Sequence, residues 1–436
     1  MRSVSMAILG LGWMVTSILA PAVWAETAAE PKSWPDGKTF ELKGMKVTLS
    51  APVLVRRDRE PYYFPKIARL PNGEIMLHSS VFAPLDLSKV DDNFLPERAE
   101  VLWSSDGGLT WKDPQNIPDG SSLHVLLPNG DMLLAPYRTF ELPKGDGLKG
   151  PLYLIPKGKH EVKTFKEGFT VTGFPRPLGR SDDQKKAGQA GWALDGAPDV
   201  MLKNGGYLAT VSGWFAQKDK KSIGQAWSNS VRTSLAAIES RDGLHWQVKS
   251  VISDENSGLP GKEGAGEASL VRLKDGRIMV IFRQEGYNTA YAQAWSSDEG
   301  LTWTKPVSCS DAYGVQPRVD KFQDGSLILI GGRPDIHVWF NADGAGKDWQ
   351  KIDLLEHHNT FEPQNPIQRN HDSLYYPFGM SSCNSEVVCL DGHTALVTYD
   401  KTPKTTSYQN TRGPKDTTNP DEMYSVWVVK VTVGNK

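Results

Sequence analysis

Three arginines follow apolar strands at one shared position, and guanidinium groups gathered in one place are a means of binding an anion. Arg138, Arg283 and Arg333 each end an apolar run that begins at an Asn-Gly or Asp-Gly turn. Arginine binds carboxylate and sulfate in a bidentate geometry that lysine cannot match, and like charges in a partly desolvated site need such a partner. If the fold brings these positions together, we expect them to bind an anionic ligand. Taken singly, each arginine is explained as well by an ion pair with a neighbouring acid.

The turns that precede these arginines belong to a hairpin pattern that recurs six times. Each copy has an apolar residue, one or two variable positions, Asn-Gly or Asp-Gly, and then an apolar strand. The turn glycines are Gly73, Gly130, Gly205, Gly276, Gly325 and, in a looser copy, Gly392. Asn-Gly and Asp-Gly between apolar runs are the strongest local hairpin signal, because both turn residues must accept positive φ. The intervals fit four-stranded units of roughly 40–50 residues plus loops better than a sandwich with turns every ~8–12 residues.

A second repeat lies in phase with the hairpins. Ser104–Trp111 and Ser296–Trp303 are full copies, Ser240–Trp246 is one residue shorter, and Asn341–Trp349 is degenerate. In these segments Asp and Ser bond the backbone of their own turn, Gly takes left-handed positions and Trp packs between sheets. The repeats therefore predict an all-β fold, a six-bladed β-propeller with Asp-box repeats over residues 26–436.

The Asp boxes together with the hairpins resemble the sialidase superfamily over nearly all of this region. The segment from Gly266 to Arg283 is similar to the part of a sialidase that carries a glutamate and the second arginine of a carboxylate-binding triad. The segment that begins at Arg333 is similar to the part with the third arginine. The resemblance implies that Glu267 partners and activates the nucleophile, that Arg283 and Arg333 bind the acid group of the substrate, and that Asp92, twelve residues before Ser104, is the acid/base, with Asp91 and Asp86 nearby.

Two residues that the resemblance leads one to expect are absent. The first triad arginine belongs two positions before a proline on the first inner strand, where this chain has Tyr63 before Pro65. Tyr63 is therefore placed among the substrate-binding candidates. The nucleophilic tyrosine belongs where the chain reads Ser382-Cys383-Asn384-Ser385, and none of the nearby tyrosines is in register. A Lys/Gly/Pro-rich stretch over about residues 140–195 also departs from the pattern, and it is interpreted as loops that shape a pocket.

Other polar and aromatic residues could contribute to a site. His124 stands at an inner-strand position that is apolar in the other repeats, so it is either a core histidine or a base that faces the funnel. Further candidates are His371, Asp195, Asp199 and Glu263, and the sugar-stacking candidates are Trp192, Trp214, Phe215, Tyr287 and Trp295.

The composition and the N-terminal segment indicate where the protein acts and which partners are excluded. With 49 basic and 51 acidic residues the net charge is −2, which argues against a nucleic-acid partner. Arg2, an apolar stretch and Val23-Trp24-Ala25 predict a signal peptide over residues 1–25 and a secreted or periplasmic protein without a membrane span. The three cysteines permit at most one bridge, and Cys383 and Cys389 are either paired or two buried thiols. No spacing suggests a metal site, and no cofactor is expected.

The leading hypothesis is an exported, exo-acting glycoside hydrolase that releases a terminal carboxylate-bearing sugar from a glycan. Its acids would be Glu267 and Asp92, and Arg283, Arg333 and Arg138 would bind the carboxylate. One alternative is a lyase acting on uronates, in which His124 or His371 abstracts a proton. Another is a glycan-binding propeller without activity, since the tyrosine is missing and fold alone does not fix function.

Overall fold

The computed structural model describes residues 33–81, 98–118, 121–186, 188–216, 231–285, 288–369, 381–403 and 423–434. All of them belong to the unit Pro31–Lys436. The expected signal peptide, Asp92, Tyr287 and His371 lie outside these ranges. Within the described ranges, no helix has the length and apolarity needed to cross a membrane.

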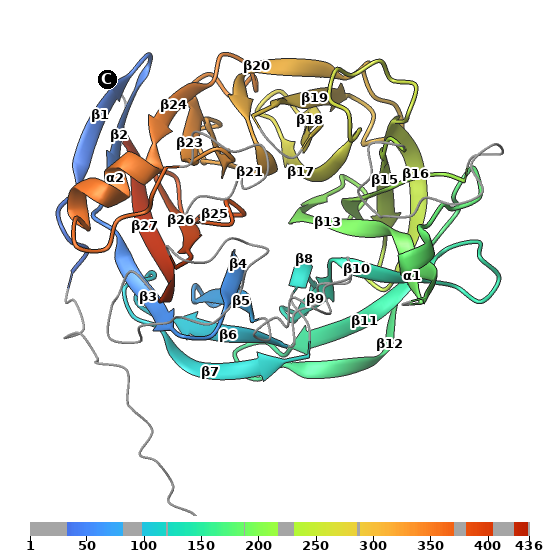
Figure 1. The fold of residues 1–436 in the computed structure, drawn as a ribbon, viewed down its shortest axis with the longest axis horizontal. Coiled ribbons are helices and arrows are strands. Elements are labelled where there is room, and N and C mark those ends of the chain that lie inside the picture. Colours follow the sequence, from blue (N-terminus) through green and yellow to red (C-terminus); the bar gives the residue numbers. More distant parts are fainter. Residues whose placement is uncertain are drawn as a thin grey trace, which may run out of the picture. The chain divides into compact units, whose positions relative to one another are not determined.

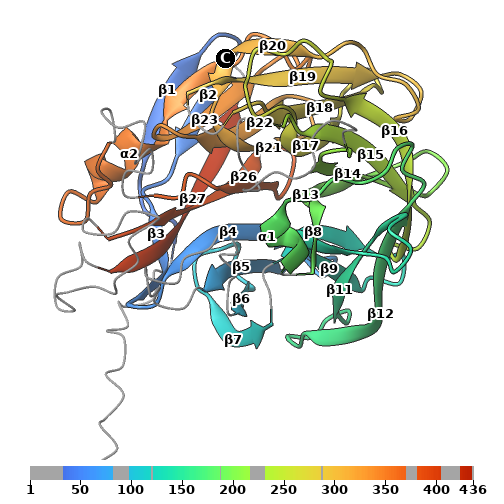
Figure 2. The same ribbon diagram turned by 45° about the vertical axis from the view of Figure 1, so that its right-hand side comes forward.

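Hydrogen bonding groups the strands into five sheets (Figures 1 and 2). The first is β4 (Tyr62–Arg69), β5 (Ile75–Val81), β6 (Arg98–Ser104) and β7 (Lys112–Ile117). The largest holds β8 (Ser121–Leu126), β9 (Met132–Pro136), β10 (Arg138–Glu141), β11 (Leu148–Ile155), β12 (Lys163–Thr172), β13 (Gln189–Met201), β14 (Tyr207–Gly213), β15 (Ser234–Ser240) and β16 (His245–Ser253).

The remaining sheets follow in chain order. The third is β17 (Gly266–Arg272), β18 (Ile278–Arg283), β19 (Ala290–Ser296) and β20 (Val307–Tyr313), and the fourth is β21 (Val315–Lys321), β22 (Leu327–Gly332), β23 (Ile336–Asn341) and β24 (Gln350–Asp353). The fifth joins the two ends of the described chain and holds β25 (Glu386–Cys389), β26 (Thr394–Lys401), β27 (Tyr424–Gly434), β3 (Val53–Asp58), β2 (Met45–Leu49) and β1 (Lys38–Leu42). The helices are α1 (Asp182–Lys186) and α2 (Leu354–Phe361).

The six predicted hairpins are confirmed as antiparallel strand pairs: β4–β5, β8–β9, β13–β14, β17–β18, β21–β22 and β25–β26. At the first turn the amide of Gly73 donates to the carbonyl of Leu70 at 3.0 Å, and Gly73 has φ +86°. Only glycine adopts this conformation without a steric penalty. Gly392 has no positive φ, which agrees with the looser sixth copy.

The first strand of each hairpin contacts the first strand of the next. The contacts run in the cyclic order β4, β8, β13, β17, β21, β25 and back to β4. Figure 1 shows these strands nearest the centre, with β7, β12, β16 and β20 on the outside. Residues at the beginning of the first strands are thus brought together from distant parts of the sequence.

The second and third hairpins share one sheet instead of forming two separate ones. β8 pairs in parallel with β13, and β12 pairs in parallel with β16. Pairing of β10 with β13 closes the path β10-β11-β12-β16-β15-β14-β13 into a ring of strands. The strands therefore form five hydrogen-bonded sheets, where the sequence predicts six blades.

The interpretation of residues 140–195 as loops is wrong, because this stretch contains β11, β12, α1 and the first part of β13. The lysines of β12 lie on its exposed positions, whereas Phe169 and Val171 are buried against Leu148. β12 pairs with β16 only over Thr170–Thr172, so its lysine-bearing first half has one unpaired side, where charged residues protect it from pairing with other chains. A Lys-, Gly- and Pro-rich composition is typical of loops, and the residues that bury one face of β12 are distant in sequence. The sequence therefore predicts a loop where a strand forms.

The Asp boxes are confirmed as turns between the third and fourth strands. In the box between β19 and β20, Ser296 Oγ donates to Asp298 Oδ1 at 2.8 Å and accepts from the amide of Gly300 at 2.8 Å. Hydrogen bonds from the side chain and amide of Thr302 lower the pKa of Asp298 to about 2. The boxes are therefore structural. Cys309, Cys383 and Cys389 are all free thiols, so Cys383 and Cys389 are not paired.

Candidate active site

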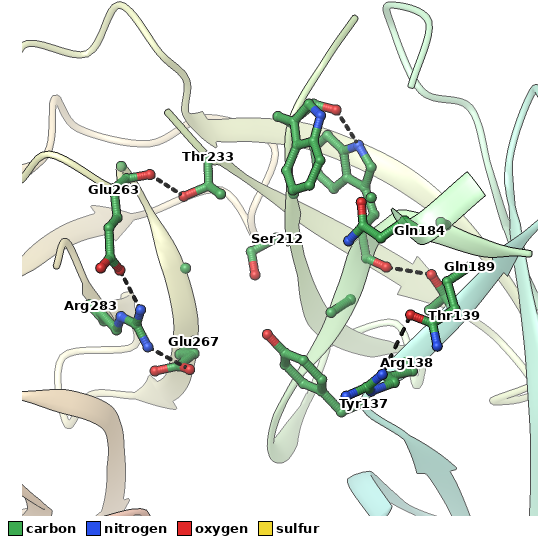
Figure 3. Close-up of a pocket in the computed structure, with 18 residues that line it drawn as sticks. Tyr137, Arg138, Thr139, Gln184, Gln189, Ser212, Thr233, Glu263, Glu267 and Arg283 are labelled. Carbon is green, nitrogen blue, oxygen red and sulfur yellow. Dashed lines mark hydrogen bonds and ion pairs between the residues drawn. The ribbon is translucent and has the colours of Figure 1, made fainter. Parts of the chain in front are cut away.

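A pocket lies where the largest sheet meets the third sheet, and about 820 Å³ of space in and at its opening, open solvent included, is not occupied by protein atoms. Glu263, Gly266, Glu267 and Arg283 line one side, and residues next to and within β10, β13, β14 and α1 line the other. Figure 3 shows the two sets of polar side chains facing each other across the opening.

On the first side, two carboxylates flank one guanidinium. Arg283 Nη1 lies 2.8 Å from Glu267 Oε1, and Arg283 Nη2 contacts Glu263 Oε2. Glu267 Oε2 also accepts a hydrogen bond from the amide of Gln316 at 3.0 Å. Burial alone would raise the pKa of Glu267, but the charges of Arg283 and Arg333 and these hydrogen bonds hold it below its usual value. Glu267 is therefore ionised.

A β-bulge places the side chain of Glu267 at this position. The register of β17 and β18 shifts after Gly266, and Glu267 has φ +49°. Phe64, Gln316 and Cys383 also have positive φ, and all four residues stand nine positions before their hairpin glycines. The distance of nine residues from the hairpin glycine therefore marks the position of Glu267 in these four repeats, which an alignment of strand ends alone does not.

On the opposite side, Arg138 donates to Gln189 Oε1 at 3.4 Å. The phenol of Tyr137 points into the pocket between Arg138 and Glu267 (Figure 3). Burial and the nearby carboxylates of Glu267 and Asp195 raise the pKa of Tyr137, so its hydroxyl stays protonated and can donate a hydrogen bond.

A helix from the stretch interpreted as loops completes this side. Gln184 of α1 lines the pocket. The backbone amide of Gln184 donates to Ser181 Oγ at 3.1 Å, and the side-chain Oε1 of Gln184 accepts from the backbone amide of Ser181 at 2.9 Å. This reciprocal pair is a capping box, and it fixes Gln184 at the pocket.

The apolar wall consists of Trp192 and Trp214, two of the predicted stacking residues. Trp192 Nε1 donates to the carbonyl of Trp214 at 2.8 Å. Gly191 and Gly213 let the backbone approach closely here, because a Cβ on Gly191 would lie 2.0 Å from the carbonyl oxygen of Gly179. Concave sites with apolar walls and a few polar groups are typical of small-molecule binding.

Beneath the pocket lies a buried ionic cluster that the sequence did not reveal, formed by Lys66, Arg318 and Glu386 where β4, β21 and β25 meet. Glu386 Oε2 lies 3.1 Å from Arg318 Nε and 3.6 Å from Lys66 Nζ. Lys66 also donates to Gln316 Oε1 at 3.0 Å, which links the cluster to Glu267 through the amide of Gln316. Burial and the charge of Arg318 lower the pKa of Lys66 to about 7.

Of the residues predicted to be catalytic or substrate-binding, Glu267, Arg283 and Arg138 line the pocket, as do the further candidates Glu263, Trp192 and Trp214. Arg333 does not line it, since Arg333 Nη2 donates to the carbonyl of Ser382 at 2.7 Å, although its charge acts on Glu267. The expected convergence of three arginines is thus reduced to two at the pocket and one behind it.

Tyr63 and His124 lie elsewhere. Tyr63 packs edge-on against Tyr424, with ring centroids 5.5 Å apart, in a hydrophobic cluster. His124 Nε2 lies 3.1 Å from His78 Nε2. Burial, followed by the charges of Lys66 and Arg318, lowers the pKa of His124 to about 3. Tyr63 was assigned by position and His124 by its polarity, and both are explained by packing. Among the described residues, no three His, Cys, Asp or Glu side chains cluster as metal ligands.

Comparison with known proteins gives a family match over part of the chain. Residues 195–388 match the family of BNR repeat-like domains, which confirms the resemblance to the sialidase superfamily indicated by the Asp boxes. No curated protein sequence matches the chain.

Solved structures with the same fold include glycosidases. A protein of unknown function from Dyadobacter fermentans is 17% identical with a TM-score of 0.62, covering 89% of this chain and 99% of that one. The NanB sialidase of Streptococcus pneumoniae, as a variant, is 12% identical with a TM-score of 0.53 (88% and 70%). An α-L-arabinanase of Penicillium chrysogenum with bound arabinobiose is 14% identical with a TM-score of 0.51 (87% and 98%). The chain thus shares a β-propeller-type fold with these solved structures.

Proposed function

We propose that this protein is an exported, exo-acting glycoside hydrolase that releases a terminal carboxylate-bearing sugar, such as a sialic acid, a related keto-sugar acid or a uronic acid, from a glycan. The observation that carries the proposal is the pocket in which Glu263 and Glu267 flank Arg283 and face Arg138. We further propose that the nine-stranded sheet represents two blades of a six-bladed propeller joined at their edges, which the cyclic contacts of the first strands support.

Two carboxylates at one pocket fit hydrolysis of a glycosidic bond. Glycosidases place a proton donor and a second carboxylate roughly 5–9 Å apart on either side of that bond. Glu267 is ionised and suits the role of the second carboxylate, which stabilises positive charge on the sugar ring or activates its attacker. Asp92, the acid expected from the resemblance, belongs to the part of the chain outside the described residues.

The arginines support an acidic sugar. Arg138 and Arg283 face the pocket from opposite sides, so a carboxylate between them would receive charge-assisted hydrogen bonds. For the lyase alternative, His124 bonds to His78 and lies outside the pocket lining, and His371 belongs to the part of the chain outside the described residues.

A neutral terminal sugar is the second candidate. The charges of Arg138 and Arg283 are balanced by those of Glu263 and Glu267 among the residues that line the pocket. A balanced pocket leaves no requirement for an anion, and an arabinanase is among the proteins with the same fold.

The test is a hydrolysis screen of the purified mature protein on sialylated, uronate-bearing, sulfated and arabinosyl glycans, with the products identified by mass. We expect a single terminal acidic sugar to be released, and Glu267→Gln to abolish its release while Glu41→Gln, a change on exposed β1, has no effect. Release of arabinose alone would favour the second candidate. An unsaturated product that absorbs in the ultraviolet would instead indicate a lyase. Sequencing the N-terminus of the exported protein tests cleavage after Ala25.

A further inference from the structure

Asp195 is a buried carboxyl group directly beneath the pocket. Its side chain is 2% exposed on β13. Asp195 Oδ1 lies 2.5 Å from Ser212 Oγ and accepts from the amide of Glu267 at 3.1 Å. Asp195 Oδ2 is also buried and has no hydrogen-bond partner among the described residues. Leaving the oxygen of a buried carboxylate unsatisfied costs free energy, and protonation of the carboxyl group lowers this cost.

The environments of Asp195 and Glu267 push their protonation in opposite directions. Burial raises the pKa of Asp195 to about 7, and the charge of Glu267 adds to this, whereas Ser212 and Arg318 act against it. Arg283 and Arg333 keep the pKa of Glu267 low. Adjacent acids whose pKa values are driven apart are the usual arrangement for one proton donor and one ionised partner.

Every element packed around Asp195 is consistent with this division. β17 contributes Glu267, β21 contributes Arg318, and the phenol of Tyr137 precedes β10. Among the described residues on neighbouring elements, Arg138 on β10 bonds to Gln189, His124 on β8 bonds to His78, and Lys185 on α1 bonds to Asp182. Of these neighbours, only Arg318 draws Asp195 towards ionisation by its charge.

Ser212 connects this acid to the pocket. Ser212 lies on β14 and lines the pocket, and its Oγ is 2.5 Å from Asp195 Oδ1. We propose, on the basis of the proposed function, that Asp195 supplies the proton for cleavage and that the Ser212 hydroxyl carries it to the glycosidic oxygen. A serine hydroxyl both accepts and donates, so it can receive a proton from Asp195 while giving its own to the substrate.

The step balances without a further reactant except water. The bond between the anomeric carbon and the glycosidic oxygen breaks, and its electron pair stays on the oxygen. That oxygen takes the proton of Ser212 Oγ, Ser212 Oγ takes the proton held by Asp195 Oδ1, the oxygen 2.5 Å away, and Asp195 becomes a carboxylate. Water then adds to the anomeric carbon, and the proton that it loses returns to Asp195 through the same hydroxyl. Asp195 is thus a positioning residue and Ser212 the group that touches substrate.

The test compares Asp195→Asn and Ser212→Ala with the wild type on whichever glycan the screen identifies, over pH 4 to 9. Asparagine has the shape of aspartate but carries no transferable proton. General acid catalysis contributes about 10²–10⁴-fold, so we expect kcat to fall at least about 100-fold in Asp195→Asn with little change in KM. The wild-type rate should decline as pH rises through about 7, where Asp195 loses its proton, and this decline should be absent from the residual activity of Asp195→Asn.

Asp320→Asn is the matched control. Asp320 is a second aspartate whose pKa burial raises, to about 6, but it bonds to the amide of Cys389 and does not line the pocket. Its variant should keep the wild-type rate and pH profile. Ser212→Ala keeps Asp195 intact and provides an independent test of the relay should Asp195→Asn fail to fold.

The outcomes separate the two proposals. Wild-type protein that hydrolyses no glycan refutes the proposed function, and the relay with it. Normal wild-type turnover with Asp195→Asn or Ser212→Ala within about threefold in kcat, or with an unchanged alkaline decline, refutes the relay and leaves the hydrolase standing.

Discussion

Replacing Glu386 by glutamine should destabilise the protein by about 3–5 kcal/mol, the range found when one partner of a buried ion pair is removed. Among the described residues, Glu386 is the one carboxylate that forms ion pairs with Lys66 and Arg318, and Arg318 is fully buried there with no hydrogen-bond partner for its Nη2. At 3.1 and 3.6 Å, and with an effective dielectric constant of about 20, each attraction is about 5 kcal/mol. The net loss is smaller than their sum, because Lys66, with its pKa already lowered to about 7, can release its proton.

Urea denaturation followed by tryptophan fluorescence measures this loss, since the chain has 14 tryptophans. The double variant Lys66→Met/Glu386→Gln should recover part of the stability, because it removes one of the two uncompensated cations. Glu41→Gln is the surface control. Glu41 and Lys46 are more than half exposed, and such pairs contribute about 0–1 kcal/mol. A loss for Glu386→Gln no larger than that of the control, or no recovery in the double variant, would refute the account of a desolvated cluster.

Three further variants test the scaffold and the site. Ser296→Ala should lower the unfolding free energy by about 1–3 kcal/mol, because the buried amide of Gly300 loses its acceptor; chemical denaturation measures it, and Ser310→Ala on an exposed strand serves as control. His160 bonds to Asp113 and Glu74, and although burial opposes it, these bonds raise its pKa. The stability that protonated His160 contributes is therefore fully present below about pH 6.5 and is lost as pH rises through the folded-state pKa. The difference in Tm between wild type and His160→Gln should shrink towards pH 9. A difference in Tm that stays constant with pH would contradict this. Burial raises the pKa of Asp195, so the stability of the wild type should fall relative to that of Asp195→Asn between about pH 4 and 7. Thermal unfolding of both proteins measures this. If their Tm values change in parallel with pH, Asp195 does not titrate in this range.

The hairpins and Asp boxes could be predicted because their physics is local. Gly73 needs positive φ within its own turn, and Asp298 is bonded by its own neighbours in sequence. The ionic cluster could not be predicted in this way, because Lys66 and Glu386 lie at opposite ends of the chain and meet only when the cycle of first strands closes.

The candidate site was predictable in part for the same reason. Glu267 and Arg283 sit on one hairpin, so their pairing follows from a local motif. Gln184 lies in the stretch interpreted as loops, and Tyr137 and Ser212 carry no local motif, so their meeting at the pocket does not follow from the sequence.

The left-handed residue nine positions before the hairpin glycine has an evolutionary meaning. Phe64, Glu267, Gln316 and Cys383 have unrelated side chains, yet each occupies the same backbone conformation in its own repeat. The positive φ is accommodated by the surrounding sheet, so this backbone conformation does not depend on one type of side chain. Selection can therefore exchange an aromatic ring, an acid, an amide or a thiol at this position of a repeat while the architecture stays the same. A chain of this kind can lose the chemistry of one relative and acquire another through single substitutions at a position that is already built.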